Sequence, residues 1–232
     1  MKSPIKVTHL IFDVDGTLLD TEICYTSVNQ AMLKKYDREF TPYMQAQMMG
    51  RGGVEANAWL LKEVGLIDQV SPEEFTAEKD AMLAKMFPEC RAFPGAERLI
   101  RHFAKKQVPM AICSGSCWRK FELKATKHRT WLDLIPIKVF CGDDKAVKRG
   151  KPFPDAFIET MRRFPIPPAS PQHVLVFEDS PNGGKAAKAA GMQCVMVPEP
   201  QFRKQCTDLN VNKVLSSLED FVPEDFGLPP FD

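Results

Sequence analysis

The sequence of 232 residues has no long apolar run and almost no net charge. No apolar stretch approaches the roughly 18 residues that a helix needs to cross a bilayer, and none precedes the first acid as in a signal peptide. The 31 Lys and Arg residues balance the 30 Asp and Glu residues to a net charge of +1, which excludes the strong positive field of nucleic-acid-binding proteins. We expect a cytoplasmic monomer that contacts neither membranes nor nucleic acid.

Disulfides and zinc are not expected either, although the chain has seven cysteines. Their number is odd, and several lie within apolar runs such as MAICS and KVFCG. This is the pattern of buried free thiols in a reducing compartment. Cys113 and Cys117 are separated by three residues rather than two and have no flanking pair of histidines, which argues against a zinc site.

Six short apolar runs with little alternation predict strands that are buried on both faces, as in a parallel sheet. They are Val7–Phe12, Pro109–Cys113, Ile137–Cys141, His173–Phe177, Gln193–Val197 and Asn212–Leu215. Helical patterns lie between several of them, at Pro94–Gln107, Pro154–Phe164 and Asn182–Ala190, the last followed by Gly191 as a C-cap. This alternation predicts an α/β fold with a doubly wound parallel sheet.

One segment, 21–87, interrupts the alternation because it contains no convincing strand. Its apolar residues follow helical spacing in three places, near Tyr25–Tyr36, at Val54–Val64 and at Pro72–Met86. We predict that this segment is a small all-helical cap domain inserted after the first strand. Residues 1–20 and 88–232 would then form the core domain.

Polar groups follow four of the predicted strands, in chain order. They are Asp13 and Asp15, then Ser114 and Gly115, then Lys151, and finally Glu178 and Asp179. Taken singly, these groups are typical of an acidic turn, a helix N-cap or a surface lysine. Because ligands bind at the carboxyl ends of parallel strands, their coincidence favours one shared site.

Four carboxylates in one site require a cation, since two unit charges 4 Å apart repel by about 4 kcal/mol at an effective dielectric constant near 20. Oxygen ligands that can share the ion with a phosphate suit Mg²⁺. A calcium loop of the EF-hand type starting at Asp13 is excluded, because its twelfth position would be Cys24 instead of glutamate. A phosphate facing a metal, Lys151 and a carboxylate suits phosphoryl transfer.

The motifs DVDGT, CSGS, GKPFPD and VFEDSPNGGKAAKAAGM stand in the order typical of the haloacid dehalogenase-like (HAD) phosphatases. The whole chain resembles this superfamily, and within it the pseudouridine-5′-phosphatases most. The resemblance implies a Rossmann-like core with a helical cap. It also implies hydrolysis of a small phosphorylated metabolite, with pseudouridine 5′-phosphate as the first substrate to expect.

The resemblance implies roles for the acidic residues. Asp13 would be the nucleophile that forms an aspartyl-phosphate, and Asp15 would be the general acid and then the general base. Mg²⁺ would be held by Asp13, Asp179 and the backbone carbonyl of Asp15. Glu178 would support these ligands from behind.

The same resemblance implies how phosphate is bound. Ser114 and the N–H of Gly115 would hold phosphate oxygens, and Lys151 would offset the charge of the phosphate and the nucleophile. In the cap, Arg51 would approach the substrate, although a solvated arginine is an equally good interpretation.

Other interpretations differ in substrate or class. Glycerol phosphate and a deoxysugar phosphate are alternative substrates, since the cap decides this choice. A phosphosugar mutase is disfavoured because the β-phosphoglucomutases carry a cap histidine twelve residues after the nucleophile, where this chain has Tyr25. A catalytically idle binding protein is disfavoured because neither the nucleophile nor a metal ligand is missing.

Overall fold

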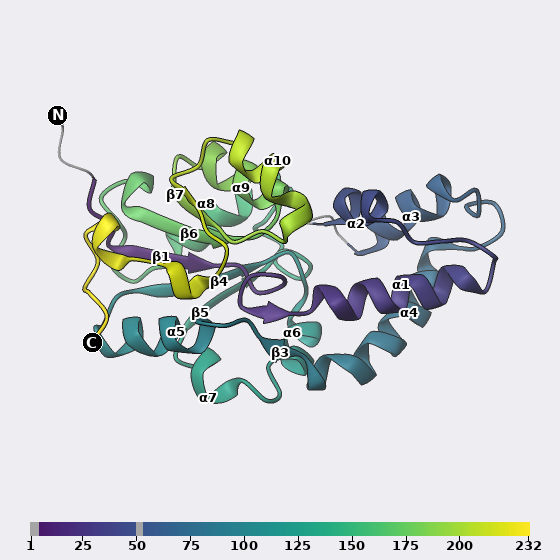
Figure 1. Cartoon of the computed structure of the whole chain (residues 1–232), viewed down its shortest axis with the longest axis horizontal. Coiled ribbons are helices and arrows are strands. Elements are labelled where there is room, and N and C mark those ends of the chain that lie inside the picture. The colour runs from purple at the N-terminus through teal and green to yellow at the C-terminus, as the bar shows by residue number, and fades with distance from the viewer. Residues whose placement is uncertain (1–4, 50–52) are drawn as a thin grey trace.

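The computed structural model describes residues 5–49 and 53–232, and its centre is a six-stranded sheet (Figure 1). The strand order is β5-β4-β1-β6-β7-β8, and all neighbouring strands are parallel. The strands are β1 (His9–Phe12), β4 (Met110–Ser114), β5 (Ile137–Phe140), β6 (Val174–Glu178), β7 (Gln193–Met196) and β8 (Lys213–Val214). All six predicted strands are confirmed, with ends that move by two residues or fewer.

Both faces of the sheet are covered, which explains why the strands read as continuous apolar runs. Leu10 and Phe12 of β1 belong to one apolar core, while Ile11 between them belongs to the other. Side chains of the helix α5 (Ala96–Lys105) pack in the first core, and those of α8 (Asp155–Arg162) and α9 (Pro181–Ala189) pack in the second. The doubly wound α/β fold is therefore confirmed.

The predicted core helices form. Helices α5 and α8 are shorter than predicted at both ends, and α9 is shifted by one residue toward the N-terminus. The expected C-cap at Gly191 is confirmed by its φ of 73°. Helix α5 begins only after Gly95, whose φ is 85°, so Pro94 lies outside it. A Cβ at Gly95 would lie 2.8 Å from the backbone nitrogen of Glu219, so the position requires glycine. Three short core helices were not predicted: α6 (Trp118–Lys124), α7 (Arg129–Leu132) and α10 (Arg203–Asp208).

The described part of the inserted segment contains four helices. They extend from one end of the sheet (Figure 1). They are α1 (Glu22–Lys34), α2 (Pro42–Met48), α3 (Gly53–Glu63) and α4 (Pro72–Met86). Helix α4 has the predicted bounds, with Ser71 accepting a hydrogen bond from the N–H of Glu74 as its N-cap. Helix α2 was not predicted. The all-helical character is confirmed, while the division into a core (1–20 and 88–232) and a cap (21–87) stays a prediction.

A second, two-stranded sheet joins the places where the chain enters and leaves this helical segment. Strand β2 (Leu19–Asp20) pairs antiparallel with β3 (Arg91–Ala92). Each strand has only two residues, so neither leaves a periodic pattern in the sequence. The pairing holds the segment that enters the inserted helices beside the segment that leaves them.

All seven cysteines are free thiols, and five of them are buried, as the sequence predicted. No helix in the described part of the chain is both long and apolar enough to span a membrane.

The packing of α5 gives a prediction about stability. Ile100 is 0% exposed, whereas Ile166 is 77% exposed. Ile100→Ala should lower the free energy of unfolding by about 2–5 kcal/mol, because it removes buried methyl groups and leaves a cavity. Ile166→Ala, the matched control, should change it by less than about 0.5 kcal/mol. Urea titration of both variants measures this, and equal losses would contradict the assigned core.

Candidate active site

The strand order places the predicted site residues at one edge of the sheet. After β1 the chain builds β4 and β5 on one side of that strand, then returns to build β6 to β8 on the other. Ligands of such sheets bind at this change of direction, outside the carboxyl ends of the strands. Asp13 follows β1, Ser114 ends β4 and Glu178 ends β6, so the three residues meet there.

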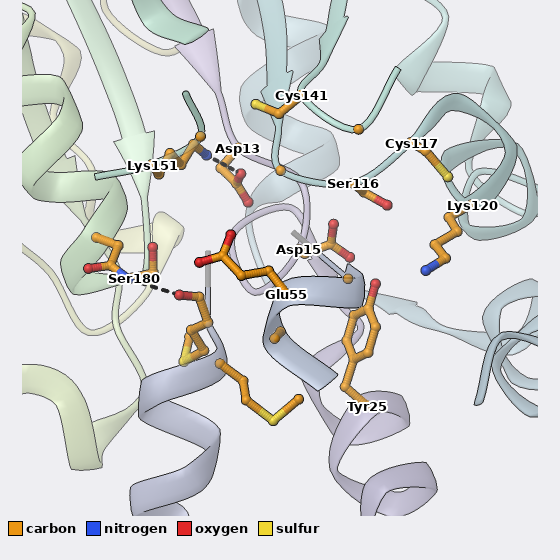
Figure 2. A pocket seen from close by; sticks show the side chains of 18 of the residues that line it. Asp13, Asp15, Tyr25, Glu55, Ser116, Cys117, Lys120, Cys141, Lys151 and Ser180 are labelled. Carbon is orange, nitrogen blue, oxygen red and sulfur yellow. Dashed lines mark hydrogen bonds and ion pairs between the residues drawn. The ribbon is translucent and has the colours of Figure 1, made fainter. Parts of the chain in front are cut away.

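Lys151 is the residue that joins these strand ends. Its Nζ donates to Asp13 Oδ1 at 2.6 Å, to Glu178 Oε1 at 2.5 Å and to the carbonyl of Cys113 at 3.2 Å. The lysine is 5% exposed. Figure 2 shows its contact with Asp13. Burial alone would lower its pKa, but Asp13 and Glu178 outweigh that effect and raise the pKa well above its usual value. The lysine is therefore a fixed positive charge.

The buried carboxylates of Asp13 and Asp179 carry more negative charge at this edge than Lys151 offsets. Burial, followed by the charge of Glu178, raises the pKa of Asp179 well above its usual range, and burial does the same for Asp13. In the described part of the chain, Asp179 has no basic side chain within 4 Å, and its Oδ1 accepts a hydrogen bond only from Thr17, at 3.0 Å. This excess of charge calls for a cation.

The donors fit Mg²⁺ in their chemistry. Asp13 and Asp179 offer carboxylate oxygens, and the backbone carbonyl of Asp15 lies in the same turn. Mg²⁺ is normally bound in this way, through one or two carboxylates with water and phosphate completing its shell.

The carboxylate of Glu178 is bound by neighbouring protein groups and does not face the cavity. Its Oε2 accepts hydrogen bonds from the N–H groups of Asp179 and Ser180, at 3.1 and 3.2 Å, and from the Ser180 hydroxyl at 3.1 Å. Helix α9 approaches so closely that a Cβ at Gly183 would lie 1.9 Å from the Glu178 carboxyl carbon. Both oxygens of Glu178 are thus in use, and its carboxylate fixes Lys151 and the Asp179 backbone.

Asp15 has a lysine of its own, which the sequence analysis did not identify. Lys124 of α6 is 1% exposed and forms an ion pair with Asp15 Oδ1, which also accepts a hydrogen bond from Thr21 at 2.6 Å. Burial would raise the pKa of Asp15, but Lys124 and these hydrogen bonds outweigh it and lower the pKa. Phe121 and Lys124 are the buried positions of α6, and their spacing of three residues places them on one face of the helix. This spacing is the signal that could have identified the lysine.

Ser114 and Gly115 lie at the carboxyl end of β4, where the sequence predicted a phosphate-binding turn. The Ser114 hydroxyl donates to Asp15 Oδ2 at 3.3 Å and accepts from the N–H of Ser116 at 3.1 Å. Gly115 lines the cavity that opens beside Asp13 and Asp15. Arg51, the residue predicted to approach the substrate from the cap, lies outside the described residues.

The cavity has a volume of about 850 Å³ and lies between the sheet edge and the inserted helices. Helix α3 contributes Glu55, whose carboxyl group points toward Asp13 (Figure 2). Helix α1 contributes Glu22 and Tyr25, and the hydroxyl of Tyr25 accepts a hydrogen bond from Lys124 at 3.1 Å. Sequence reasoning did not identify Glu22 or Glu55, because which face of an inserted helix meets the site depends on how the helix packs.

Comparison with known proteins agrees with this geometry. Residues 7–191 match the sequence family described as haloacid dehalogenase-like hydrolases. The chain belongs to the haloacid dehalogenase-like hydrolases. It is 44% identical over 227 residues to (DL)-glycerol-3-phosphatase 2 of Arabidopsis thaliana, covering 98% of this chain and 94% of the relative. It is 41% identical to a probable pseudouridine-5′-phosphatase of Drosophila melanogaster, covering 97% and 96%. This HAD hydrolase is thus a phosphatase of small phosphate substrates, as predicted.

Solved structures show the same fold at low sequence identity. The β-phosphoglucomutase of Clostridium difficile superimposes with a TM-score of 0.78 at 20% identity, covering 94% of this chain and 95% of that structure. CbbY from Rhodobacter sphaeroides in complex with phosphate gives a TM-score of 0.75 at 21% identity, covering 92% and 96%. The core fold of the HAD hydrolases is therefore confirmed for this chain.

The buried pair of Lys124 and Asp15 gives a prediction about stability. Lys124→Met should lower the free energy of unfolding by about 3–5 kcal/mol, because it leaves the Asp15 carboxylate buried without its cation. Lys127 pairs with Glu89 at the surface, where the two side chains are 53% and 71% exposed. Lys127→Met, the matched control, should cost about 1 kcal/mol or less. A loss of that small size for Lys124→Met, in chemical denaturation, would refute the buried pair.

The position of Glu22 gives a prediction about pH. Burial, then the charges of Asp15 and Glu199, raise the pKa of Glu22 to about 7. The folded state therefore disfavours the carboxylate, and this contribution lowers stability as pH rises from about 4.5 to about 7. Glu22→Gln should raise the free energy of unfolding relative to wild type by about 1–3 kcal/mol at pH 8, and should change it little at pH 4.

Denaturant titrations at the two pH values, without metal, test this difference. Glu39 is exposed, so Glu39→Gln serves as the matched control and should change stability by less than about 0.5 kcal/mol at either pH. A gain from Glu22→Gln that is equal at both pH values would argue against the raised pKa.

Proposed function

We propose that this HAD phosphatase hydrolyses a phosphomonoester in two steps, through an aspartyl-phosphate on Asp13, with Mg²⁺ as cofactor. The observation that carries the proposal is the buried contact of Lys151 with Asp13 at the change of strand direction, beside the uncompensated Asp179. Lys151 holds one oxygen of Asp13 and so leaves the other to meet phosphorus. A lysine at this point also lowers the cost of bringing a phosphate dianion to a carboxylate.

The cation would be held by Asp13, Asp179 and the carbonyl of Asp15. When bound, Mg²⁺ would neutralise charge on the carboxylates and polarise the phosphate. Thr17 keeps Asp179 oriented through its hydroxyl, and Gly16 makes room for it, since a Cβ there would lie 2.3 Å from Asp179 Oδ2. Ser114 and the N–H of Gly115 would bind phosphate oxygens. Arg51 stays a prediction for contact with the substrate.

Asp15 suits the general acid and base role. Its low pKa makes it a carboxylate at rest, which is the form needed to take a proton from the attacking water in the second step. The first step needs a proton on Asp15 for the leaving oxygen. A phosphate dianion bound beside it would raise its pKa and so favour that proton.

Two substrates have specific support. Pseudouridine 5′-phosphate is the substrate expected from the sequence and is named in one relative, and glycerol 3-phosphate is named in another at 44% identity. The cavity of about 850 Å³ has room for either. Transfer to a second sugar is disfavoured, because Tyr25 stands where the mutases carry a histidine and its hydroxyl is bound by Lys124.

A substrate panel tests the function. Steady-state turnover of pseudouridine 5′-phosphate, glycerol 3-phosphate, a deoxysugar phosphate and phenyl phosphate is measured with Mg²⁺ and again with excess chelator. We expect hydrolysis that depends on the metal and favours one of the first two substrates. Absence of turnover of every monoester with Mg²⁺ present would overturn the proposal. Cell fractionation tests the predicted cytoplasmic location, which needs a test because one relative is named as mitochondrial. Light scattering tests the predicted monomeric state.

Asp15→Asn gives the sharpest single test of the mechanism. The amide keeps the size of the side chain but cannot transfer the proton, so kcat should fall by about 10²–10⁴-fold. Asp68 is exposed and distant from the cavity lining, so Asp68→Asn is the matched control and should keep the wild-type rate. An unchanged kcat for Asp15→Asn would remove Asp15 from the proton transfer.

A further inference from the structure

One face of α1 is polar and turned to the cavity. Glu22, Tyr25, Thr26 and Asn29 all line it, and their spacing of three, one and three residues places them on one side of a helix. The apolar residues Val28 and Met32 of the same helix are buried in the core on another side. A polar helix face toward an enclosed space needs hydrogen-bonding partners there.

The side-chain oxygen of Asn29 has no hydrogen-bonding partner within the described part of the chain. Its side chain is almost wholly buried, at 3% exposure, and its Oδ1 accepts no hydrogen bond. Burying an amide without partners costs about 1–3 kcal/mol. A second asparagine of the same cavity shows the contrast, because Asn57 donates to Thr76 Oγ1 at 2.8 Å and accepts from Lys79 Nζ at 3.1 Å. Asn29 therefore points to a ligand that supplies its hydrogen bonds.

The opposite wall of the cavity adds a free acceptor. Glu55 of α3 points toward Asp13 (Figure 2), and no ion pair involves it among the described residues. The cations of this wall are already engaged, since Lys79 donates to Asn57 and Lys120 pairs with Asp80 at 2.7 Å. Among the described residues, the space that a leaving group would occupy is thus lined by two unused acceptors, Asn29 and Glu55.

We propose that Asn29 and Glu55 form a subsite for the leaving group, and that it selects an uncharged leaving group with several hydroxyl groups. The inference rests on the proposed function, because it takes phosphate to lie at Asp13. A hydroxyl donates to the Glu55 carboxylate in a charge-assisted hydrogen bond, and another donates to the Asn29 amide oxygen. A leaving group with a carboxylate or a second phosphate would be repelled by Glu55.

Substitution of Asn29 separates this role from a structural one. Asn29→Leu should lower kcat/KM for whichever hydroxylated substrate the wild type prefers by about 10-fold more than for phenyl phosphate, whose leaving group has no further hydroxyl. It should also raise the melting temperature of the substrate-free protein, because an unpartnered buried amide is lost. Asn57→Leu, the matched control, should lower the melting temperature, since it removes a partnered amide.

Substitution of Glu55 tests the selection against charge. Glu55→Gln should raise kcat/KM for phosphoglycolate relative to glycerol 3-phosphate by about 10-fold, because a like charge facing the carboxylate is removed. Glu39→Gln, at an exposed position outside the cavity lining, should leave this ratio unchanged.

The outcomes distinguish the subsite from the proposed function. Suppose that the wild type hydrolyses its substrates. The subsite alone would then be overturned if Asn29→Leu left the ratio of kcat/KM between the hydroxylated substrate and phenyl phosphate unchanged, or if it lowered the melting temperature. An unchanged phosphoglycolate ratio in Glu55→Gln would overturn the selection against charge. A wild type that hydrolyses no monoester, phenyl phosphate included, would overturn the proposed function and the subsite with it.

Discussion

The contact of Lys151 with Asp13 and Glu178 is the interaction on which the site depends. One buried ammonium group joins the residue after β1, the last residue of β6 and the carbonyl of Cys113 near the end of β4. Removing any member would leave a charge buried without its partner, which costs far more than the intact cluster gains. The cluster thus fixes the spacing of three strand ends, and with it the place where phosphate chemistry can occur.

The two aspartates of the DVDGT motif lie two residues apart, yet their surroundings shift their pKa values in opposite directions. Burial raises the pKa of Asp13, while Lys124 and the hydroxyls of Thr21 and Ser114 overcome burial and lower that of Asp15. Carboxyl groups whose pKa values are driven apart are suited to different tasks. The proposed division into nucleophile and acid–base group follows from this difference in environment, since the two side chains are chemically identical.

The sequence was informative where structure follows from local pattern. Runs such as Val7–Phe12 predicted the six main strands because both faces of this sheet are buried, and polar residues after four strands predicted the convergence of Asp13, Lys151 and Glu178. The pairing of β2 with β3 could not be predicted, because two residues leave no period. Lys124 was missed because a lysine in a short helix is usually exposed, and Asn29 because only packing shows which helix face meets the cavity.

Two segments far apart in the sequence, near Val7 and near Phe226, are joined at one end of the core. The N–H of Val7 donates to the carbonyl of Phe226 at 2.9 Å, so the beginning and end of the core are tied together. Both lie at the end of the sheet remote from α1 to α4 (Figure 1). The hydrogen bond between these two segments therefore closes the end of the core opposite to the cavity, so that substrate can bind and leave without disturbing it.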